Sequence, residues 1–384
     1  MSPVRRLAFV AGARPNFMKV APIIAEMERR GNTAPRAFLV HTGQHYDRDM
    51  SEVFFEDLQL RRPDVFLGVG SASHAEQTAK VMIAFEKLCV DERPDGVVVV
   101  GDVNSTVAAA LVAVKLGIPT AHVEAGLRSF DRTMPEEINR IVTDAIADLL
   151  FTTCEEADAN LLREGVASSK IHLVGNVMID SLLRQRARAR SSKILADLGL
   201  AHGSAPARPY GVLTLHRPSN VDASDRLAGI LDAVGKVASR IPIVFPIHPR
   251  TMKQAEAFGL AERLRPRERG ETPTEGLVVT GPLGYHDFVR LVADARLVLT
   301  DSGGIQEETT ILGVSCLTLR DNTERGITVT EGTNTLVGTD PARIVAAAEA
   351  ALDAPSAHGR MPRLWDGRAA ARIVDVLVRE LGGP

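Results

Sequence analysis

The sequence predicts an α/β protein made of two doubly wound halves, each with a parallel sheet flanked by helices. Short apolar segments alternate with amphipathic ones along most of the chain, which is the pattern of repeated strand–helix units. The run Val97–Val100 is apolar without alternation, as in strands buried on both faces of a parallel sheet. A length of 384 residues is enough for two ordinary domains.

Four strands are predicted in the first half, and each ends near a glycine or a polar residue. They are "RLAFVAG" (6–12), "AFLVHTG" (37–43), "GVVVVGD" (96–102) and "PTAHVEAG" (119–126). A helix over 15–30 follows the first strand. Pro22 lacks the N–H of the helical ladder, so we expect this helix to kink or restart there.

The segment "PEEINRIVTDAIADLL" (135–150) predicts a helix that begins at Pro135. Apolar positions 138, 141, 142, 145, 146 and 149 predict its buried face. The opposite side, expected in solvent, carries Glu137, Arg140, Asp144 and Asp148. Arg140 lies four residues after Glu136 and three after Glu137. A helix-surface ion pair with Arg140 is therefore an adequate explanation for at least one of these glutamates.

Residues 184–209 are rich in Arg, Ala, Ser and Pro and predict a helix end followed by an interdomain connection. Their four alternating arginines are expected on a solvated face. The α/β pattern then restarts, with five strands predicted in "YGVLTLHRPSN", "IPIVFPIHPRT", "EGLVVTGPLG", "ARLVLTDSGG" and "VSCLTLRDNTE". A weak echo links "VAGARPN" with "LTLHRPSN". The closing helix has an apolar stripe at 370, 373, 374, 377 and 381 that must pack on something.

Composition excludes several classes of function. The formal net charge of −3 argues against a nucleic-acid-binding surface. Three widely spaced cysteines support neither a disulfide framework nor a zinc site, and they favour buried thiols in a reducing compartment. The N-terminal apolar run is too short for a signal peptide, and no apolar stretch reaches the roughly 20 residues of a membrane span. A cytoplasmic protein without membrane or nucleic-acid partners is expected.

The segment "TDSGGIQEETTILG" (300–313) carries the sharpest local signal. A strand ends at Thr300, a turn of small residues opens a helix, and the helix closes near Gly313. The free N–H groups at such a helix start favour an anion, and the glycines allow close approach to a ligand. Neither a P-loop nor a dinucleotide fingerprint is present. The residues alone leave open a plain structural turn or a diphosphate-binding one.

Basic side chains follow strands in both halves. Arg14 and Lys19, in "GARPNFMKVAP" (12–22), would neutralise phosphate, or else lie on the surface. His216, in "TLHRPSN" (214–220), is suited to protonating or stabilising a phosphate leaving group, although a lone histidine is more often structural. His248, in "PIHPRT" (246–251), occupies a similar place.

Three carboxylates converge on one edge of the predicted first sheet. Asp102 and Glu124 each end a strand, and Glu136 starts the helix one loop after Glu124. Because ligands bind beyond the carboxyl ends of parallel strands, these side chains would face a cleft between the two halves. Individually each has a structural explanation. Asp102 could be only a capping residue, and the helix after it has other candidate N-caps, namely Asn104, Ser105 and Thr106.

The motifs, taken together, resemble the non-hydrolysing UDP-N-acetylglucosamine 2-epimerase family. The chain is similar to the family in "GARPNFMKVAPI", "TGQH", "GDVNST", "HVEAGLRS", "PEEINR", "GNVMIDSLL", "TLHRP", "DSGGIQEE", "RDNTER", "GTNTLVG" and "DGRAAARI". These motifs cover nearly the whole chain, and "DSGGIQEE" preceded by "HVEAGLR" is highly specific.

The resemblance implies a fold and a reaction. The fold is two facing Rossmann-like domains of the glycosyltransferase-B type, with boundaries near 1–182 and 183–365 and a final helix, 366–384, that packs back on the first domain. The reaction is the reversible interconversion of UDP-N-acetylglucosamine and UDP-N-acetylmannosamine, through elimination of UDP to a 2-acetamidoglucal and re-addition. Such a reaction would feed surface polysaccharide synthesis. No cofactor and no metal is implied, and family members are usually homodimers.

The resemblance also assigns residues. The positions that match the family's catalytic set are Asp102, Glu124, Glu136 and His216. Those matching its UDP-binding set are Arg14, Lys19, Phe288, Ser302, Gly303, Gly304, Glu308 and Arg325, to which we add His248. An allosteric UDP-N-acetylglucosamine site would use Gln44 and His45. The chain departs from the family in "YDRDMSE" after "TGQH" and in "HRPSN" where many members have "HRRE". Alternatives on the same scaffold are a hydrolysing 2-epimerase, a carbon-4 or uronic-acid epimerase, a UDP-sugar glycosyltransferase and a nucleotide-sugar sensor.

Overall fold

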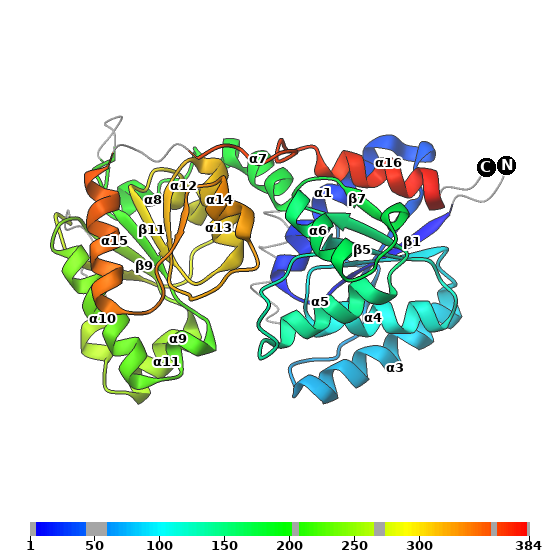
Figure 1. The fold of residues 1–384 in the computed structure, drawn as a ribbon, viewed down its shortest axis with the longest axis horizontal. Helices are drawn as coiled ribbons and strands as arrows, with labels where there is room; N and C mark the ends of the chain where they lie inside the picture. The colour runs from blue at the N-terminus through cyan, green and yellow to red at the C-terminus, as the bar shows by residue number, and fades with distance from the viewer. Residues whose placement is uncertain (1–4, 44–59, 202–206, 265–272, 355–358, 382–384) are drawn as a thin grey trace. The chain divides into compact units, whose positions relative to one another are not determined.

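The computed structural model describes residues 5–43, 60–201, 207–264, 273–354 and 359–381. It divides into two compact units (Figure 1). The first unit comprises Met1–Leu183 and Arg363–Pro384, and the second comprises Arg184–Pro362. Each unit holds one parallel sheet flanked by helices, which confirms the predicted fold class. None of the helices in the described residues has the length and apolar character that crossing a membrane requires.

The sheet of the first unit has seven parallel strands in the order β3-β2-β1-β4-β5-β6-β7. The strands are β1 (Arg6–Ala11), β2 (Arg36–His41), β3 (Val65–Phe66), β4 (Gly96–Val100), β5 (Thr120–Ala125), β6 (Leu149–Thr152) and β7 (Ile171–Leu173). The helices are α1 (Arg14–Arg30), α3 (His74–Glu92), α4 (Asn104–Lys115), α5 (Pro135–Ile146), α6 (Glu155–Arg163), α7 (Val177–Ala189, which continues into the second unit) and α16 (Ala369–Leu381).

The sheet of the second unit has six parallel strands in the order β10-β9-β8-β11-β12-β13. The strands are β8 (Gly211–Thr214), β9 (Ile243–Pro246), β10 (Leu277–Thr280), β11 (Leu297–Thr300), β12 (Ser315–Thr318) and β13 (Asn334–Leu336). The helices are α8 (Ile194–Asp197), α9 (Pro218–Val221), α10 (Ser224–Ala238), α11 (Pro249–Ala257), α12 (Tyr285–Ala293), α13 (Gly303–Leu312), α14 (Gly326–Thr330) and α15 (Pro341–Asp353).

Both faces of the second sheet are buried, which explains why its strands lack alternation. Leu213 and Leu299 pack with apolar residues of α10 and α15. Their neighbours Val212 and Val298 pack on the other face, with residues of α8, α12 and α13. Since successive side chains of a strand point to opposite faces, a strand between two helical layers must be apolar throughout.

The strand order reverses at one place in each sheet. In the first unit this switch point lies between β1 and β4, and in the second between β8 and β11. Ligands of doubly wound sheets bind beyond the carboxyl ends of the strands at such a point. The similar segments "VAGARPN" and "LTLHRPSN" begin with the last two residues of β1 and β8, which hold the same place in their sheets. Both runs of predicted site residues therefore begin at a switch point.

The C-terminal helix α16 belongs to the first unit and packs against α1 (Figure 1). All five positions of its predicted apolar stripe are buried, including Ile373 and Leu377. Asp180 accepts hydrogen bonds from the first two backbone N–H groups of α16, at 3.1 and 2.8 Å. A buried carboxylate thus satisfies N–H groups that a helix start leaves without partners inside the helix. The four alternating arginines of 184–190 are exposed, as predicted.

Three local predictions were wrong. Of the kink or restart expected at Pro22, the restart is contradicted, because helix α1 is continuous from Arg14 to Arg30. The N-cap of α4 is Val103, which offers no side-chain acceptor, and the three candidate caps lie inside the helix. Thr106 instead donates from its hydroxyl to the carbonyl of Val100. Finally, the helix predicted over 135–150 ends at Ile146, and Leu149 begins the unforeseen strand β6.

Candidate active site

Lys19 of helix α1 and Glu124 at the end of β5 form a buried ion pair in the first unit. Lys19 Nζ lies 2.8 Å from Glu124 Oε2, and both side chains are almost fully buried. A Cβ atom added to Gly101 would lie 2.9 Å from Lys19 Nζ, so the glycine lets the ammonium group lie against the chain next to Asp102. Lys19 therefore connects the two predicted catalytic segments that follow β4 and end β5.

The backbone at Glu124 has an unusual conformation. Its φ is +75°, in the left-handed region that side chains other than glycine rarely adopt. The pairing of β5 with β6 shifts register between Val123 and Ala125, which marks an irregularity at Glu124. Such bulges redirect a side chain at the end of a strand, and strained backbone of this kind concentrates at functional sites.

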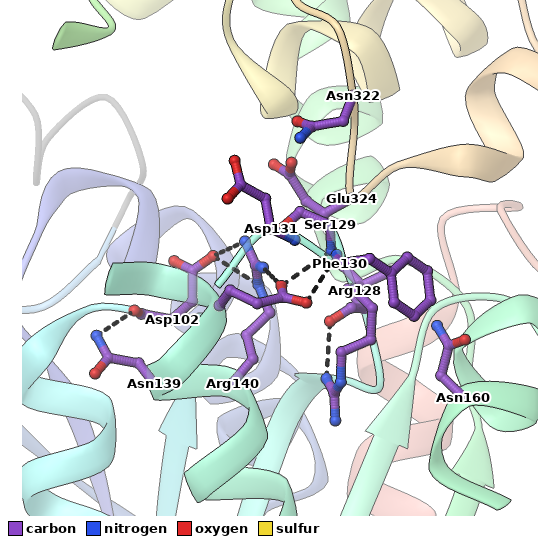
Figure 2. Close-up of polar contacts among 12 residues, drawn as sticks. Asp102, Arg128, Ser129, Phe130, Asp131, Asn139, Arg140, Asn160, Asn322 and Glu324 are labelled. Carbon is purple, nitrogen blue, oxygen red and sulfur yellow. Dashed lines mark hydrogen bonds and ion pairs between the residues drawn. The ribbon is translucent and has the colours of Figure 1, made fainter. Parts of the chain in front are cut away.

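Asp102 is held by Arg140 from helix α5 (Figure 2). Arg140 donates from Nε and from its terminal nitrogen to Asp102 Oδ2, at 3.1 and 2.9 Å. Asn139 donates to the carbonyl of Asp102 at 2.9 Å. The Asp102 side chain is 22% exposed, so it is oriented by the protein and still reachable from solvent.

Glu137 is buried beneath the loop that connects β5 with α5. Its carboxylate accepts the backbone N–H groups of Ser129 and Phe130, each at 2.9 Å. Arg140 lies 2.5 Å from the same carboxylate. The predicted ion pair therefore exists, but in the interior and not on the helix surface. Glu136, one residue earlier in the first turn of α5, is exposed.

Of the four charged residues predicted on the solvent side of this segment, only Asp148, which follows α5, is exposed, and the three within α5 face inward. Glu137, Arg140 and Asp144 are at most 2% exposed, whereas Ile138 of the predicted apolar stripe is 37% exposed. The reason is that these charged groups pair with one another and with the β5–α5 loop, so their burial leaves no charge unpartnered.

A second buried network stabilises the chain around Glu124. His122 lies 2.7 Å from Asp144 through Nδ1 and 2.8 Å from the carbonyl of Gly101 through Nε2. Asp144 also accepts the backbone N–H of Gly126 and pairs with Arg128 at 2.7 Å. Burial raises the pKa of Asp144, but the His122 and Arg128 charges outweigh it, and the net pKa lies below the ordinary value. This network fixes both ends of the segment that contains Glu124.

Other residues predicted in the first unit are less informative. Arg14 is exposed at the first position of α1. Gln44 and His45, the expected allosteric residues, lie outside the described residues.

His216 and Asp301 meet at the switch point of the second unit. His216 follows β8 and Asp301 follows β11, two adjacent parallel strands. His216 Nδ1 lies 2.9 Å from Asp301 Oδ1, and the same carboxylate accepts the backbone N–H groups of His216 and Arg217. Burial raises the pKa of Asp301, but the hydrogen bond and charge of His216 and these N–H groups lower it more, to a net value below the ordinary one.

His248 lies close to His216. The centroids of the two rings are 5.9 Å apart. His248 is the N-cap of α11, and its Nδ1 accepts the backbone N–H of Arg250 at 3.2 Å. Burial, the positive charge of His216 and that of Arg250 lower the pKa of His248, against the opposing effect of Asp301.

The DSGG turn opens helix α13 as predicted. The strand ends at Thr300, Ser302 is the N-cap, and the helix closes at Gly313 with a φ of +72°. A Cβ atom on Gly303 would lie 2.6 Å from Glu324 Oε1, so a larger residue there would have to displace the Glu324 carboxylate. Within the described residues, nothing lies within 4 Å of a Cβ atom built on Gly304. The backbone at Gly304 is therefore open to a ligand.

Acidic and basic groups pair along α13 and the segment before α14. Arg325 lies 2.7 Å from Glu307, and both are buried. Glu308 is buried and accepts the hydroxyl of Tyr285 at 3.2 Å. Phe288 lies on α12 and packs against the apolar cluster beneath α13. Each of these predicted residues thus has a defined place within the second unit.

The sequence reasoning missed Asp301, Asp144 and His122 as functional or supporting residues. Asp301 was placed only in the turn, although a carboxylate at the end of a buried strand is itself a signal. Asp144 was assigned to the solvent face of its helix. Among the described residues, no three or more His, Cys, Asp or Glu side chains are grouped so that they could hold a metal ion.

The chain is similar to known proteins over nearly its whole length. The family model described as UDP-N-acetylglucosamine 2-epimerase matches residues 27–378. The chain is 42% identical over 382 residues to the UDP-N-acetylglucosamine 2-epimerase of Methanocaldococcus jannaschii, covering 97% of this chain and 98% of that protein. It is 38% identical over 382 residues to the UDP-2,3-diacetamido-2,3-dideoxy-D-glucuronate 2-epimerase of Pseudomonas aeruginosa, covering 97% and 99%.

Solved structures extend the comparison to the fold. A crystal structure of the Methanocaldococcus jannaschii enzyme in complex with UDP-GlcNAc and UDP matches with a TM-score of 0.87 and 42% identity, covering 97% of this chain and 99% of that one. MurG of Acinetobacter baumannii matches with a TM-score of 0.51 at 12% identity, covering 98% and 100%, a likeness of fold alone that places the architecture in the glycosyltransferase-B type. From the match of the family model and of relatives over nearly its whole length, the chain belongs to the UDP-N-acetylglucosamine 2-epimerase family.

Proposed function

We propose that this protein interconverts UDP-N-acetylglucosamine and UDP-N-acetylmannosamine by eliminating UDP and adding it back. The observation that carries the proposal is the pair of oriented carboxylates Asp102 and Glu124 at neighbouring strand ends, held by Arg140 and Lys19. Inversion at carbon 2 requires a proton to leave one face of the sugar and another to arrive on the opposite face. Positioned carboxylates serve such transfers, each contributing on the order of 10²–10⁴ in rate.

In this proposal, one carboxylate removes the proton from carbon 2 and another returns a proton to the opposite face. In the elimination, the carbon 2–hydrogen bond breaks, a carboxylate takes the proton, and the carbon 1–oxygen bond breaks so that UDP leaves with the electron pair. Re-addition reverses these steps with protonation on the other face. Asp102, Glu124 and Glu136 are the candidates, and the exposure of Glu136 suits a group that meets substrate.

The second unit would bind the UDP moiety. The backbone N–H groups at the start of α13, with Ser302, Gly303 and Gly304, would bind the diphosphate, because a helix start favours anions. Glu308 would accept bonds from ribose hydroxyls, with Phe288 near the base. His216 would protonate or stabilise the departing β-phosphate oxygen. Arg14, Lys19, His248 and Arg325 complete the proposed set of basic groups.

A second candidate substrate deserves a parallel test. The similarity to the Pseudomonas aeruginosa 2-epimerase named for a diacetamido uronic acid favours a UDP-sugar of that class. The chemistry at carbon 2 would be the same, so the carboxylates do not discriminate between the two substrates.

The test is incubation of the protein with each UDP-sugar in deuterated water, followed by NMR. We expect UDP-N-acetylmannosamine that carries deuterium at carbon 2. Exchange only with the diacetamido uronic acid substrate would assign the second candidate. Free UDP together with N-acetylmannosamine would indicate a hydrolysing enzyme. Binding without exchange at carbon 2 would refute both epimerase assignments.

We further propose a cytoplasmic homodimer. The three cysteines are buried free thiols, as suits a reducing compartment. Apolar side chains exposed on the neighbouring helices α3, α4 and α5, such as Ile83, Val114 and Ile138, support an interface with a second copy. Light scattering coupled to size exclusion checks the mass, and a monomer would contradict the dimer.

A further inference from the structure

We infer that Asp301 is a positioning residue that fixes the tautomer and the orientation of His216 for work at the UDP β-phosphate. The inference deepens the proposed function and rests on it. Neither the motif comparison nor the sequence reasoning gives Asp301 a role beyond a turn. The structure places its carboxylate against the ring of a predicted catalytic histidine, from an adjacent strand, at the switch point of the UDP-binding unit.

The carboxylate of Asp301 is held rigidly. It is fully buried and accepts the backbone N–H of His216 at 3.1 and 3.2 Å, that of Arg217 at 3.0 Å and the amide of Asn220 at 3.2 Å. Asn220 also donates to the carbonyl of Leu319. Because these four N–H contacts fix the carboxylate, they also fix the direction from which the imidazole ring must bond to it.

The contact with His216 determines where the ring proton lies. An ionised carboxylate is only an acceptor, so Nδ1 of His216 must be the donor at 2.9 Å. The second nitrogen, Nε2, then has its lone pair free in the neutral ring. No described residue takes Nε2 in a hydrogen bond, and the side chain is 42% exposed. His216 therefore presents one defined nitrogen to a ligand.

This arrangement fits the proton transfer that the elimination needs. In the charged ring, Nε2–H gives its proton to the β-phosphate oxygen of departing UDP, so that an N–H bond breaks and an O–H bond forms. The ring returns to the neutral Nδ1–H tautomer without moving, because Nδ1–H stays bonded to Asp301 throughout.

Asp301 could also have a purely structural role, and the experiment must distinguish that role from the positioning of His216. Its bonds to the backbone N–H groups join the ends of β8 and β11 and would support the fold whatever the ring did. A structural role predicts that replacing Asp301 lowers kcat by the same factor whether or not position 216 is a histidine. A positioning role predicts that the cost disappears when His216 is absent, because residues that act as a unit are not additive.

The first measurement is the tautomer of His216 in the intact protein. Long-range ¹⁵N–¹H NMR spectra of the protein labelled with ¹⁵N-histidine, recorded above the titration of the ring and assigned with H216N, should show the Nδ1–H form. In D301N the amide can donate to Nδ1, and we expect the Nε2–H form. An Nε2–H tautomer in the wild-type protein, or an unchanged tautomer in D301N, would overturn the inference. This measurement needs no turnover, so it stands if the proposed reaction fails.

The second measurement is a double-mutant cycle on turnover, with D301N, H216N and the double variant. We expect D301N to lower kcat by roughly 10²- to 10⁴-fold with KM changed little, and to cost nothing further in the H216N background. D353N is the matched control, since Asp353 pairs with Arg240 on the surface of the same unit, and its kcat and tautomer should equal those of the wild type. An equal loss from D301N in both backgrounds would make Asp301 structural. If D301N does not fold, the wild-type tautomer decides.

Discussion

Lys19 and Glu124, 105 positions apart in the sequence, form a buried ion pair of 2.8 Å between helix α1 and the carboxyl end of strand β5. The pair joins a residue predicted to bind UDP to a residue predicted to transfer protons. Removing one member leaves the other as a buried charge that has lost its partner, which costs far more than a surface pair is worth.

For this reason K19M should lower the free energy of unfolding by about 3–5 kcal/mol. The double variant K19M/E124Q should recover part of that loss, because the charge of Glu124 is then absent as well. Urea unfolding followed by circular dichroism measures both. K115M, a change at an exposed lysine at the end of α4, is the control and should leave stability unchanged. A K19M protein as stable as the wild type would show that the pair is not buried in solution.

The adjacent glutamates of α5 should behave in opposite ways. E136Q should lose turnover by roughly 10²- to 10⁴-fold and retain its stability and its affinity for UDP, because Glu136 is exposed. E137Q should lose about 3 kcal/mol of stability, since Glu137 accepts two loop N–H groups and pairs with Arg140. Turnover, UDP titration and thermal unfolding of both variants test this. Unchanged turnover in E136Q would leave Glu136 as a helix-end charge only.

A methyl group at Gly126 should be destructive. The φ of Gly126 is +78°, and an added Cβ atom would lie 2.5 Å from the carbonyl oxygen of Ala157. We expect G126A to lose more than about 3 kcal/mol of stability. Gly117 has a similar φ of +70°, but nothing in the described residues lies within 4 Å of its added Cβ. G117A should therefore cost only about 1 kcal/mol of backbone strain. Equal losses would mean that the close contact with Ala157 is absent.

Glu26 should make the docking of α16 sensitive to acid. Hydrogen bonds from Arg29, and less strongly from Arg30, outweigh burial and lower the pKa of Glu26 from 4.5 to about 2. Arg30 also pairs with Asp375 of α16 at 2.6 Å. Because the folded pKa lies below the unfolded one, this stabilisation is present above pH 4.5 and is lost as the pH falls towards 2.

We expect E26Q to cost about 1 kcal/mol at neutral pH, since the arginine partners are partly in solvent. The difference from the wild type should shrink steadily between pH 4.5 and 2. Denaturant unfolding at a series of pH values measures it, with E86Q, at an exposed position of α3, as control. A difference independent of pH would contradict the assigned pKa.

Much of the fold followed from the sequence. Short, mostly apolar segments that end near a glycine or polar residue predicted the strands β1, β2, β4, β5 and β8 to β12, and the unbroken valine run of β4 reflects burial on both faces. The stripe on α16 and the turn that opens α13 were equally local signals. Short strands such as β3 and β13 carry too few residues to show a pattern, and β6 directly follows a helix, so its apolar residues extended the helical pattern.

The sequence did not reveal which face of α5 is buried. A helical pattern separates a charged side from an apolar side, and it does not say which side meets other protein. Here the charged side is inside, because Glu137, Arg140 and Asp144 find partners on Asp102, Arg128 and the β5–α5 loop.

The candidate site divides in the same way. The sequence by itself determined the strand ends, the glycine turns and the acidic and basic residues placed there, since these depend on local backbone geometry. Only the tertiary structure decided which of them meet. His216 pairs with Asp301 because the parallel strands β8 and β11 end side by side at the switch point of the second sheet. Lys19 pairs with Glu124 because helix α1, which follows β1, brings the ammonium group past the end of β4 to the end of β5.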